Sequence, residues 1–124
     1  MSPKILVVED NIMNRELVVT VLEAAGFTAL QCDDAEHAIA LAASELPDVI
    51  LMDVGLPGID GLAATRMLKG DPRTANIPVV AVSAHAMKAD ETRALAAGCH
   101  AYLTKPIDTR SLPMIVRRFL ARGE

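Results

Sequence analysis

The feature that most constrains the fold is a fivefold alternation of short apolar runs with segments of helical periodicity. Residues 5–8, 49–52 and 77–82 form continuous apolar runs, which is typical of strands buried on both faces of a sheet. Residues 27–32 and 100–103 complete the set of predicted strands. Helical segments between successive strands favour parallel pairing, so we predict an α/β fold: a doubly wound five-stranded parallel sheet with helices on both faces.

Capping residues indicate where the connecting helices begin and end. Asn11, Asp34 and Asp60 each precede a helical segment, where a short polar side chain can accept a hydrogen bond from a free backbone N–H. Gly26 and Gly98 follow two of the segments, as expected for glycines that terminate helices. The predicted helices span residues 12–25, 35–44, 62–69, 87–97 and 109–122.

The start of the last helix has two alternatives because of Pro113. With Asp108 as the cap, Pro113 lies past the first turn and removes a backbone hydrogen bond. With Ser111 as the cap, Pro113 lies in the first turn, where proline is well tolerated. The sequence alone does not decide between them.

Composition excludes several classes of function. The 124 residues include 12 basic and 16 acidic side chains, for a net charge of −4, and only 2% of residues are aromatic. We expect no nucleic-acid partner, because single-stranded nucleic acid requires a basic groove and stacking rings. The length fits one domain, residues 1–124, and we expect no output domain attached to it.

The remaining bulk features indicate a soluble, cytoplasmic protein. Cys32 and Cys99 lack the spacing of a disulfide framework or a zinc site, so we expect reduced thiols. No apolar run approaches the roughly 18 residues of a membrane-spanning helix, and we expect no membrane association. The first apolar run is too short and too soon followed by acidic residues to be a signal peptide.

Polar residues follow four of the predicted strands, where binding sites of parallel sheets form. Glu9 and Asp10 follow the first strand, Asp53 the third, Ser83 the fourth and Lys105 the fifth. In a doubly wound sheet these positions converge on one crevice. The sequence therefore predicts a site of three carboxylates, a hydroxyl and an ammonium group.

This set of groups suits magnesium and phosphoryl chemistry. Clustered carboxylates repel one another unless a cation shares the site, and oxygen ligands without thiolate or imidazole suit Mg²⁺. Asp10, Asp53 and one loop carbonyl would suffice as protein ligands. A carboxylate can then attack phosphorus, while the metal, a lysine and a hydroxyl hold the developing negative charge.

The whole chain, from about residue 4 to residue 120, resembles the receiver domains of two-component response regulators. Four motifs carry the resemblance, each at a strand end: Val-Val-Glu9-Asp10-Asn11, Leu-Met-Asp53-Val-Gly-Leu-Pro57-Gly, Val-Ser83-Ala84 and Leu-Thr-Lys105-Pro106. No single motif is specific, but their combination in this order is. The resemblance implies a (βα)5 flavodoxin-like fold with strand order 2-1-3-4-5.

The resemblance also implies residue roles. Asp53 would be the phosphoacceptor. Asp10, Asp53 and the backbone carbonyl of Gly55 would bind Mg²⁺, for which Mn²⁺ can substitute, and Glu9 would complete the acidic pocket through water.

Further roles follow for the ends of the last two strands. Ser83 and Lys105 would contact the phosphoryl oxygens, and the Lys105–Pro106 bond is expected to be cis. Ser83 and Tyr102 resemble the family's switch pair, in which the aromatic ring turns inward when the hydroxyl engages the phosphoryl group. A static, half-buried Tyr102 is the alternative.

As a receiver, the chain would be a signalling protein rather than an enzyme, apart from its own phosphorylation and slow dephosphorylation. The donor would be a sensor histidine kinase or a histidine phosphotransfer protein. A downstream protein target would bind the face formed by the fourth helix, fifth strand and fifth helix. The motifs around residues 9–14 and 84–90 are most similar to receivers of hybrid kinases and to single-domain regulators, including those of the bacterial cell cycle.

Three positions are candidate modulators. Gly55 stands where the family usually has a larger side chain, and His85 lies two residues after Ser83. Both flank the path of the attacking water in family members, so our hypothesis is that Gly55 shortens the lifetime of the acyl phosphate. Asn14 either helps to position the metal site or is an ordinary residue of the first helical turn.

Other functions fit the sequence less well. The main alternative is a small Mg²⁺-dependent phosphohydrolase with an aspartate nucleophile. Such enzymes carry an Asp-x-Asp motif after the first strand. Here the candidate nucleophile, Asp53, follows the third strand, and Gly55 stands where the second acid would be. A flavin or nucleotide carrier would need a phosphate-binding loop where Glu9 and Asp10 lie. A degenerate receiver that is never phosphorylated would not need the complete acidic set.

Overall fold

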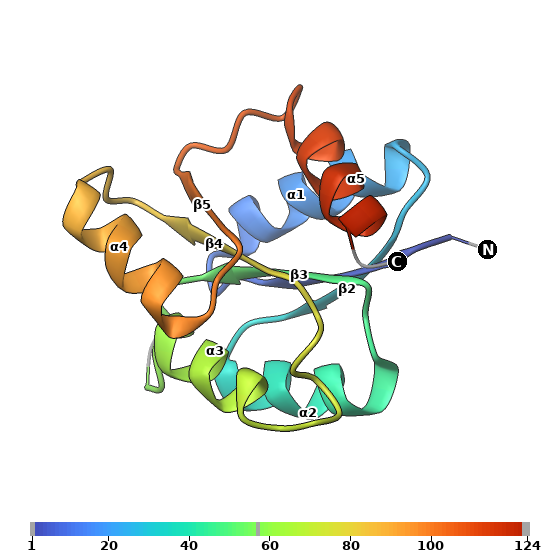
Figure 1. Ribbon diagram of the computed structural model, residues 1–124. Helices are drawn as coiled ribbons and strands as arrows, with labels where there is room; N and C mark the ends of the chain where they lie inside the picture. The colour runs from blue at the N-terminus through green and yellow to red at the C-terminus, as the bar shows by residue number, and fades with distance from the viewer. Residues whose placement is uncertain (1, 57, 123–124) are drawn as a thin grey trace.

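The structure is a computed structural model that describes residues 2–56 and 58–122, with side chains to residue 120. Five parallel strands form one sheet in the order β2-β1-β3-β4-β5, which confirms the predicted fold class and strand order (Figure 1). Pro57 of the second motif lies outside the described residues. The strands are β1 Lys4–Val8, β2 Thr28–Cys32, β3 Val49–Asp53, β4 Val79–Ser83 and β5 Ala101–Thr104.

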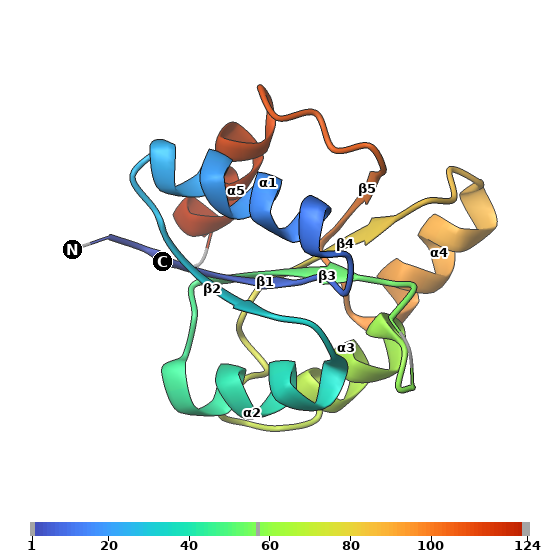
Figure 2. The same ribbon diagram turned by 180° about the vertical axis from the view of Figure 1, so that it is seen from behind.

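Helices cover both faces of this sheet. Helices α1 and α5 lie together on one face, and α2 and α3 lie on the other, with α4 beside α3 towards the β5 edge (Figures 1 and 2). This is the doubly wound arrangement that the alternation predicts. The helices are α1 Ile12–Ala24, α2 Ala35–Glu45, α3 Gly61–Lys69, α4 Lys88–Ala97 and α5 Leu112–Arg122.

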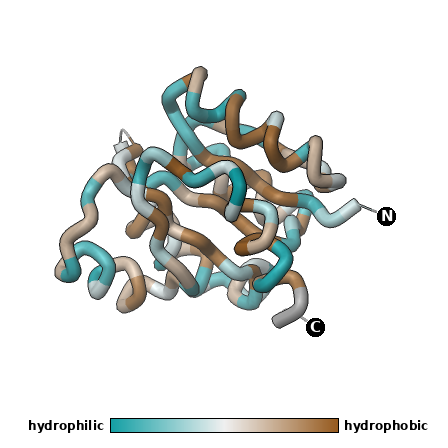
Figure 3. The backbone as a smooth tube through the Cα atoms, turned by 90° about the horizontal axis from the view of Figure 1, so that it is seen from above, coloured by the Kyte–Doolittle hydropathy of each residue, from teal (hydrophilic) through white to brown (hydrophobic). Residues whose placement is uncertain are grey.

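The core consists of two apolar clusters separated by the sheet. Alternate residues of a strand point to opposite faces, so Leu6 and Val8 pack under α2 and α3, whereas Ile5 and Val7 pack under α1 and α5. The central strands β1, β3 and β4 are buried almost completely. Hydrophobic colour accordingly runs along the central strands and alternates with hydrophilic colour around the helices (Figure 3).

Three predicted caps are present, and they fix where the helices begin at the site's edge of the sheet. The side chains of Asn11, Asp34 and Asp60 accept hydrogen bonds from the third residue after each of them, at 2.9, 2.8 and 2.8 Å. Helix α4 differs, because its cap position is Met87 and no side chain caps it.

Some predicted boundaries are wrong by one to three residues. Strand β4 begins at Val79 rather than at residue 77, because the Ile77 N–H bonds back to Thr74 in a turn and Pro78 has no N–H to donate. Helix α5 begins at Leu112 rather than at residue 109, and the Ser111 carbonyl accepts from the Ile115 N–H. Ser111 therefore holds the cap position, which settles the alternatives for the last helix.

Both cysteines are free: Cys99 is buried and Cys32 is half-buried. Burial raises the pKa of the Cys32 thiol to about 11, and the neighbouring carboxylates of Asp34 and Asp33 add to this effect. Burial also raises the pKa of Cys99. Within the described residues, no helix is long and apolar enough to cross a membrane.

Candidate functional site

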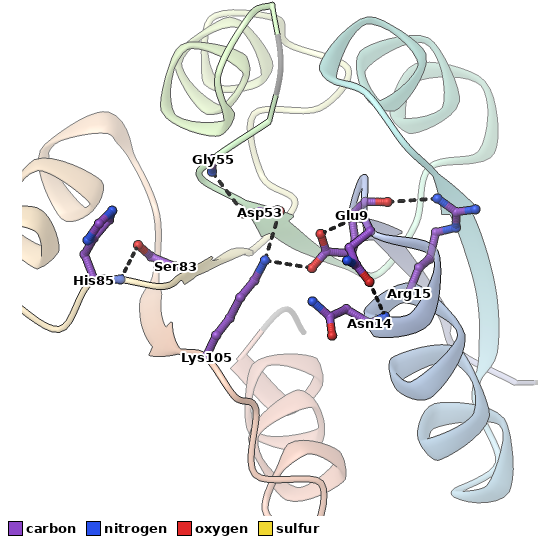
Figure 4. A network of polar contacts seen from close by, with 9 residues as sticks. Glu9, Asn14, Arg15, Asp53, Gly55, Ser83, His85 and Lys105 are labelled. Atoms are coloured by element: carbon purple, nitrogen blue, oxygen red, sulfur yellow. Dashed lines mark hydrogen bonds and ion pairs between the residues drawn. The ribbon is translucent and has the colours of Figure 1, made fainter.

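The fold brings the predicted site residues together at the carboxyl edge of the sheet (Figure 4). Asp53 and Ser83 are the last residues of β3 and β4. Glu9 and Asp10 follow β1, and Lys105 follows β5. The parallel register places these strand ends side by side, as the sequence predicts.

Lys105 is the centre of the polar network. Its Nζ lies 2.9 Å from Glu9 Oε1 and 3.1 Å from Asp53 Oδ2 (Figure 4). Both carboxylates are buried, with 6% and 4% of their surface exposed. A buried carboxylate without a partner is costly, so the ammonium group is needed to hold two of them in this position. The Lys105–Pro106 peptide bond that follows is cis, as predicted.

The two buried carboxyl groups have different protonation preferences. Burial raises the pKa of Glu9 above its ordinary value, and a hydrogen bond with Asp53 raises it further. Burial is the largest single effect on Asp53 and raises its pKa, whereas the hydrogen bond from Glu9 lowers it. The Gly55 N–H and Lys105 act in the same direction as Glu9, so the pKa of Asp53 is lowered overall. Asp53 is thus the carboxylate that stays ionised.

Two glycines shape the backbone around Asp53. The Gly55 N–H donates to Asp53 Oδ1 at 3.0 Å, and a Cβ at Gly55 would meet only that oxygen, at an ordinary 3.7 Å. At Gly61, the first residue of α3, a Cβ would lie 2.2 Å from the Asp53 carbonyl oxygen. The close approach of α3 to Asp53 therefore requires glycine at Gly61, whereas the space beside Gly55 is open.

Glu9 is held by contacts on both sides of its backbone. Its N–H donates to the Cys32 carbonyl at 3.1 Å, and its carbonyl accepts from Arg15 Nη1 at 3.0 Å. The Asn11 N–H donates to Glu9 Oε2 at 3.1 Å. Asp10 lies between these anchored residues and is exposed.

The donor set fits a hard divalent cation. Carboxylate oxygens of Glu9, Asp10 and Asp53 lie within 4.8 Å of one another. All are oxygens, and the exposed Asp10 leaves room for water, as Mg²⁺ prefers. The single positive charge of Lys105 neutralises only part of the negative charge of the three carboxylates. Glu9, Asp10 and Asp53 are thus close enough to share a cation. Their role as the residues that would hold Mg²⁺ stays a prediction, as does that of the Gly55 carbonyl.

Ser83, His85 and Tyr102 form a separate group across the crevice. Ser83 is buried, and its Oγ accepts from the His85 N–H at 3.1 Å. The half-buried Tyr102 donates its hydroxyl to the His85 carbonyl at 2.6 Å. Ser83 and Tyr102 are therefore connected through the backbone of one exposed residue, His85. Motion of one member of the predicted switch pair can thus be transmitted to the other through this backbone.

Asn14 lines a cavity of about 290 Å³ with Glu9 and Lys105, and Leu17 and Pro106 contribute apolar walls. Its side chain is exposed. Asn14 is thus beside the site, and its role in positioning the metal stays a prediction.

Two residues of this site, Arg15 and Gly61, are absent from the sequence-based prediction. A cation near the N-terminus of a helix opposes the helix dipole, which is a signal that could have identified Arg15. Gly61 is the first residue of α3, and glycine is a poor helix former, so its presence there could have indicated a close backbone contact.

Comparison with known proteins agrees with this geometry. Residues 5–117 match the response regulator receiver domain family. The chain is 39% identical over 120 residues to the polar-differentiation response regulator DivK of Brucella ovis, which covers 97% of this chain and 98% of that protein. DivK of Brucella suis gives the same values.

Solved structures give the same result. A response regulator from Chloroflexus aurantiacus superposes with a TM-score of 0.94 at 30% identity, over 98% of this chain and 100% of that one. The receiver domain of the sensor histidine kinase PA1611 from Pseudomonas aeruginosa gives a TM-score of 0.90 at 32% identity, over 98% and 99% of the two chains. That structure is described with a magnesium ion coordinated in its active site cleft. The chain belongs to the response regulator receiver domains, which are signalling proteins rather than enzymes.

Proposed function

We propose that this protein is a phosphoacceptor of a two-component phosphorelay, in which Asp53 takes a phosphoryl group from a partner's phosphohistidine. The observation that carries this proposal is the Lys105 ammonium bound to both Asp53 and Glu9 at the carboxyl edge of the sheet. The lowered pKa of Asp53 keeps a nucleophilic carboxylate at neutral pH. The raised pKa of Glu9 makes it the partner that takes up a proton first.

In the transfer, an oxygen of Asp53 forms a bond to phosphorus as the donor's N–P bond breaks. The electron pair of that bond goes to the imidazole nitrogen of the donor. Lys105 already binds Asp53 and has a raised pKa because its hydrogen bonds to the two carboxylates outweigh burial, so it stays charged and contacts the phosphoryl oxygens. Bound Mg²⁺, held by Asp10 and Asp53, would supply further stabilisation of negative charge.

The output is a change in protein–protein binding. Ser83 moves to the new phosphoryl group and gives up its bond from the His85 N–H, which changes the segment that Tyr102 also contacts. The face of α4, β5 and α5 then changes its affinity for a downstream protein. Phosphorylation thus shifts a two-state element rather than creating a new fold.

Labelling tests the assignment of Asp53. The chain is incubated with Mg²⁺ and acetyl phosphate, or with a phosphorylated histidine donor, and the Asp53→Asn variant serves as the comparison. We expect Mg²⁺-dependent labelling of the unaltered chain and none of the variant. Equal labelling of the two would contradict the proposal. Release of phosphate over many turnovers from a small phosphoester would instead support the phosphohydrolase alternative.

We further propose that the small size of Gly55 shortens the lifetime of the acyl phosphate. A Cβ at this position would meet only Asp53 Oδ1, at 3.7 Å, so no side chain fills the space between Gly55 and the carboxylate. In the Gly55→Asn variant the side chain would occupy that space, and we expect a longer half-life of the phosphorylated protein. Equal half-lives in the two proteins would refute this proposal.

A further inference from the structure

Arg15 makes contacts that its place in helix α1 does not explain. Its guanidinium donates from Nη1 to the Glu9 carbonyl at 3.0 Å (Figure 4). Its Nε donates to Gln31 Oε1 at 3.3 Å. In the described part of the chain, no carboxylate forms an ion pair with it. The cation lies near the N-terminus of α1, where the helix dipole is unfavourable for it. Its contacts must therefore offset this cost.

Arg15 connects three segments at the point where the acidic pair begins. It belongs to α1, it binds the carbonyl of Glu9 just after β1, and it reaches Gln31 in β2. Since the Glu9 N–H already bonds to the Cys32 carbonyl, both polar groups of the Glu9 backbone are fixed. Arg15 is half-buried, and its guanidinium lies at the end of the paired strands β1 and β2.

This contact determines where Asp10 lies. The Glu9 carbonyl and the Asp10 nitrogen share one planar peptide unit, so fixing the carbonyl also fixes the direction in which the chain continues to the Asp10 Cα. Asp10 itself is exposed. Its position relative to Glu9 and Asp53 therefore depends on the backbone that Arg15 holds.

We propose that Arg15 is a positioning residue that orients the Glu9–Asp10 backbone for binding of a divalent cation. This inference rests on the proposed function, because it concerns the Mg²⁺ that the acidic cluster would hold. Mg²⁺ demands a near-ideal octahedral arrangement, so displacement of one carboxylate weakens binding. Loss of a residue that orients metal ligands typically costs 10- to 100-fold in metal affinity.

Positioning and simple electrostatics predict opposite results. Removal of a positive charge near the cluster would by itself strengthen binding of a cation. Removal of the group that orients Asp10 would weaken it. The Arg15→Met variant, which keeps the aliphatic stem, separates the two effects by the direction of the change.

The experiment is a Mg²⁺ titration followed by the amide signals of ¹H–¹⁵N NMR spectra, with thermal unfolding measured in the absence of Mg²⁺. We expect Mg²⁺ binding by Arg15→Met to be about tenfold weaker than by the unaltered chain. The Arg15→Lys variant keeps the positive charge and one donor nitrogen, so its Mg²⁺ affinity should lie between those of Arg15→Met and the unaltered chain. Arg73→Met is the matched control: Arg73 is exposed and pairs with Asp71, so its loss should leave Mg²⁺ affinity unchanged.

Unchanged or tighter Mg²⁺ binding by Arg15→Met would overturn the inference while leaving the proposed function intact. Absence of saturable Mg²⁺ binding by the unaltered chain would overturn the proposed function and the inference with it. Should Arg15→Met not fold, Gln31→Met removes the outer anchor of the guanidinium and should weaken Mg²⁺ binding by a smaller factor. Unchanged affinity in that variant would likewise overturn the inference.

Discussion

The two halves of the site are built differently. On the β1–β3 side, Glu9 and Asp53 are buried and held by backbone hydrogen bonds and by Lys105. On the β4 side, residues 84–87 are all exposed, and α4 begins without a side-chain cap. Among the residues that the structure describes, the side-chain hydrogen bonds to that segment are those of the His85 backbone with Ser83 and Tyr102.

Under the proposed function, this difference would separate the residues of the chemical step from those of the switch. Groups that must present fixed charges to a metal and a phosphoryl group benefit from a rigid frame. A segment that must change position should have few buried contacts, and its hydrogen bonds should be exposed to solvent. We expect substitutions on the first side to alter reaction and stability, and substitutions on the second to alter local motion.

Lys105→Met should have the largest effect. Removal of the ammonium group leaves two buried carboxylates unpaired and takes away a group that would stabilise the transferring phosphoryl oxygens. We expect labelling by acetyl phosphate to slow by about 10²–10³-fold. The control is Lys88→Met, which makes the same charge change at an exposed position in α4. An unchanged rate in Lys105→Met would contradict the central role of this residue.

A pair of glycine variants tests the rigidity of the frame. Gly61→Ala places a Cβ 2.2 Å from the Asp53 carbonyl oxygen, so the free energy of unfolding should fall by about 1–3 kcal/mol, although alanine is the better helix former. Gly55→Ala meets no obstacle, and the change should stay within about 0.5 kcal/mol. Urea unfolding measures both. Equal stability of the two variants would mean that α3 can move away from Asp53 at little cost.

Glu9→Gln tests the charge balance of the buried pair. Because the pKa of Glu9 is raised in the folded protein, the folded state favours its protonated form, and this contribution to stability is lost as the pH rises above the ordinary value of 4.5. Without divalent cations, Glu9→Gln should therefore unfold at a higher temperature than the unaltered chain at pH 7.

The same variant has a control in its pH dependence. The advantage of Glu9→Gln should shrink as the pH falls to 4.5 and below, where Glu9 becomes protonated in both the folded and the unfolded protein. The comparison is made above pH 3.8, the ordinary pKa of Asp53, because the pKa of Asp53 depends in part on Glu9 and therefore differs between the two proteins. An advantage that is independent of pH would point to packing rather than to charge.

Tyr102→Phe should have the smallest effect on stability. It removes one hydroxyl bond to the His85 carbonyl at the exposed segment, so the free energy of unfolding should fall by less than about 1 kcal/mol. Hydrogen exchange of the His85 amide should nevertheless become faster, while that of the Gly55 amide stays the same. Faster exchange at both amides would show that the two sides are not independent.

Much of this arrangement could be predicted because it depends on local patterns. The apolar runs define the strands, and the polar residues that follow them reach the same edge once the sheet is parallel. The caps Asn11, Asp34 and Asp60 act within one helical turn, so their effect is visible in the sequence.

The remaining features depend on contacts between segments far apart in the chain. The clash that a Cβ at Gly61 would make, and the bond from Arg15 to Gln31, exist only after the helices have packed on the sheet. The start of α5 at Leu112 depended on how Pro113 fits a turn, which the sequence left open. Strand β4 was predicted too long because an apolar residue, Ile77, belongs to a turn.

The free cysteines have a practical consequence. With the pKa of Cys32 raised to about 11 and that of Cys99 raised by burial, both thiols stay protonated at neutral pH, and a protonated thiol is a poor nucleophile. A cysteine introduced in the exposed segment, as in Ala86→Cys, should thus react with a maleimide dye far faster than either native thiol. Fluorophores could then report on the β4–α4 segment without prior removal of the native cysteines.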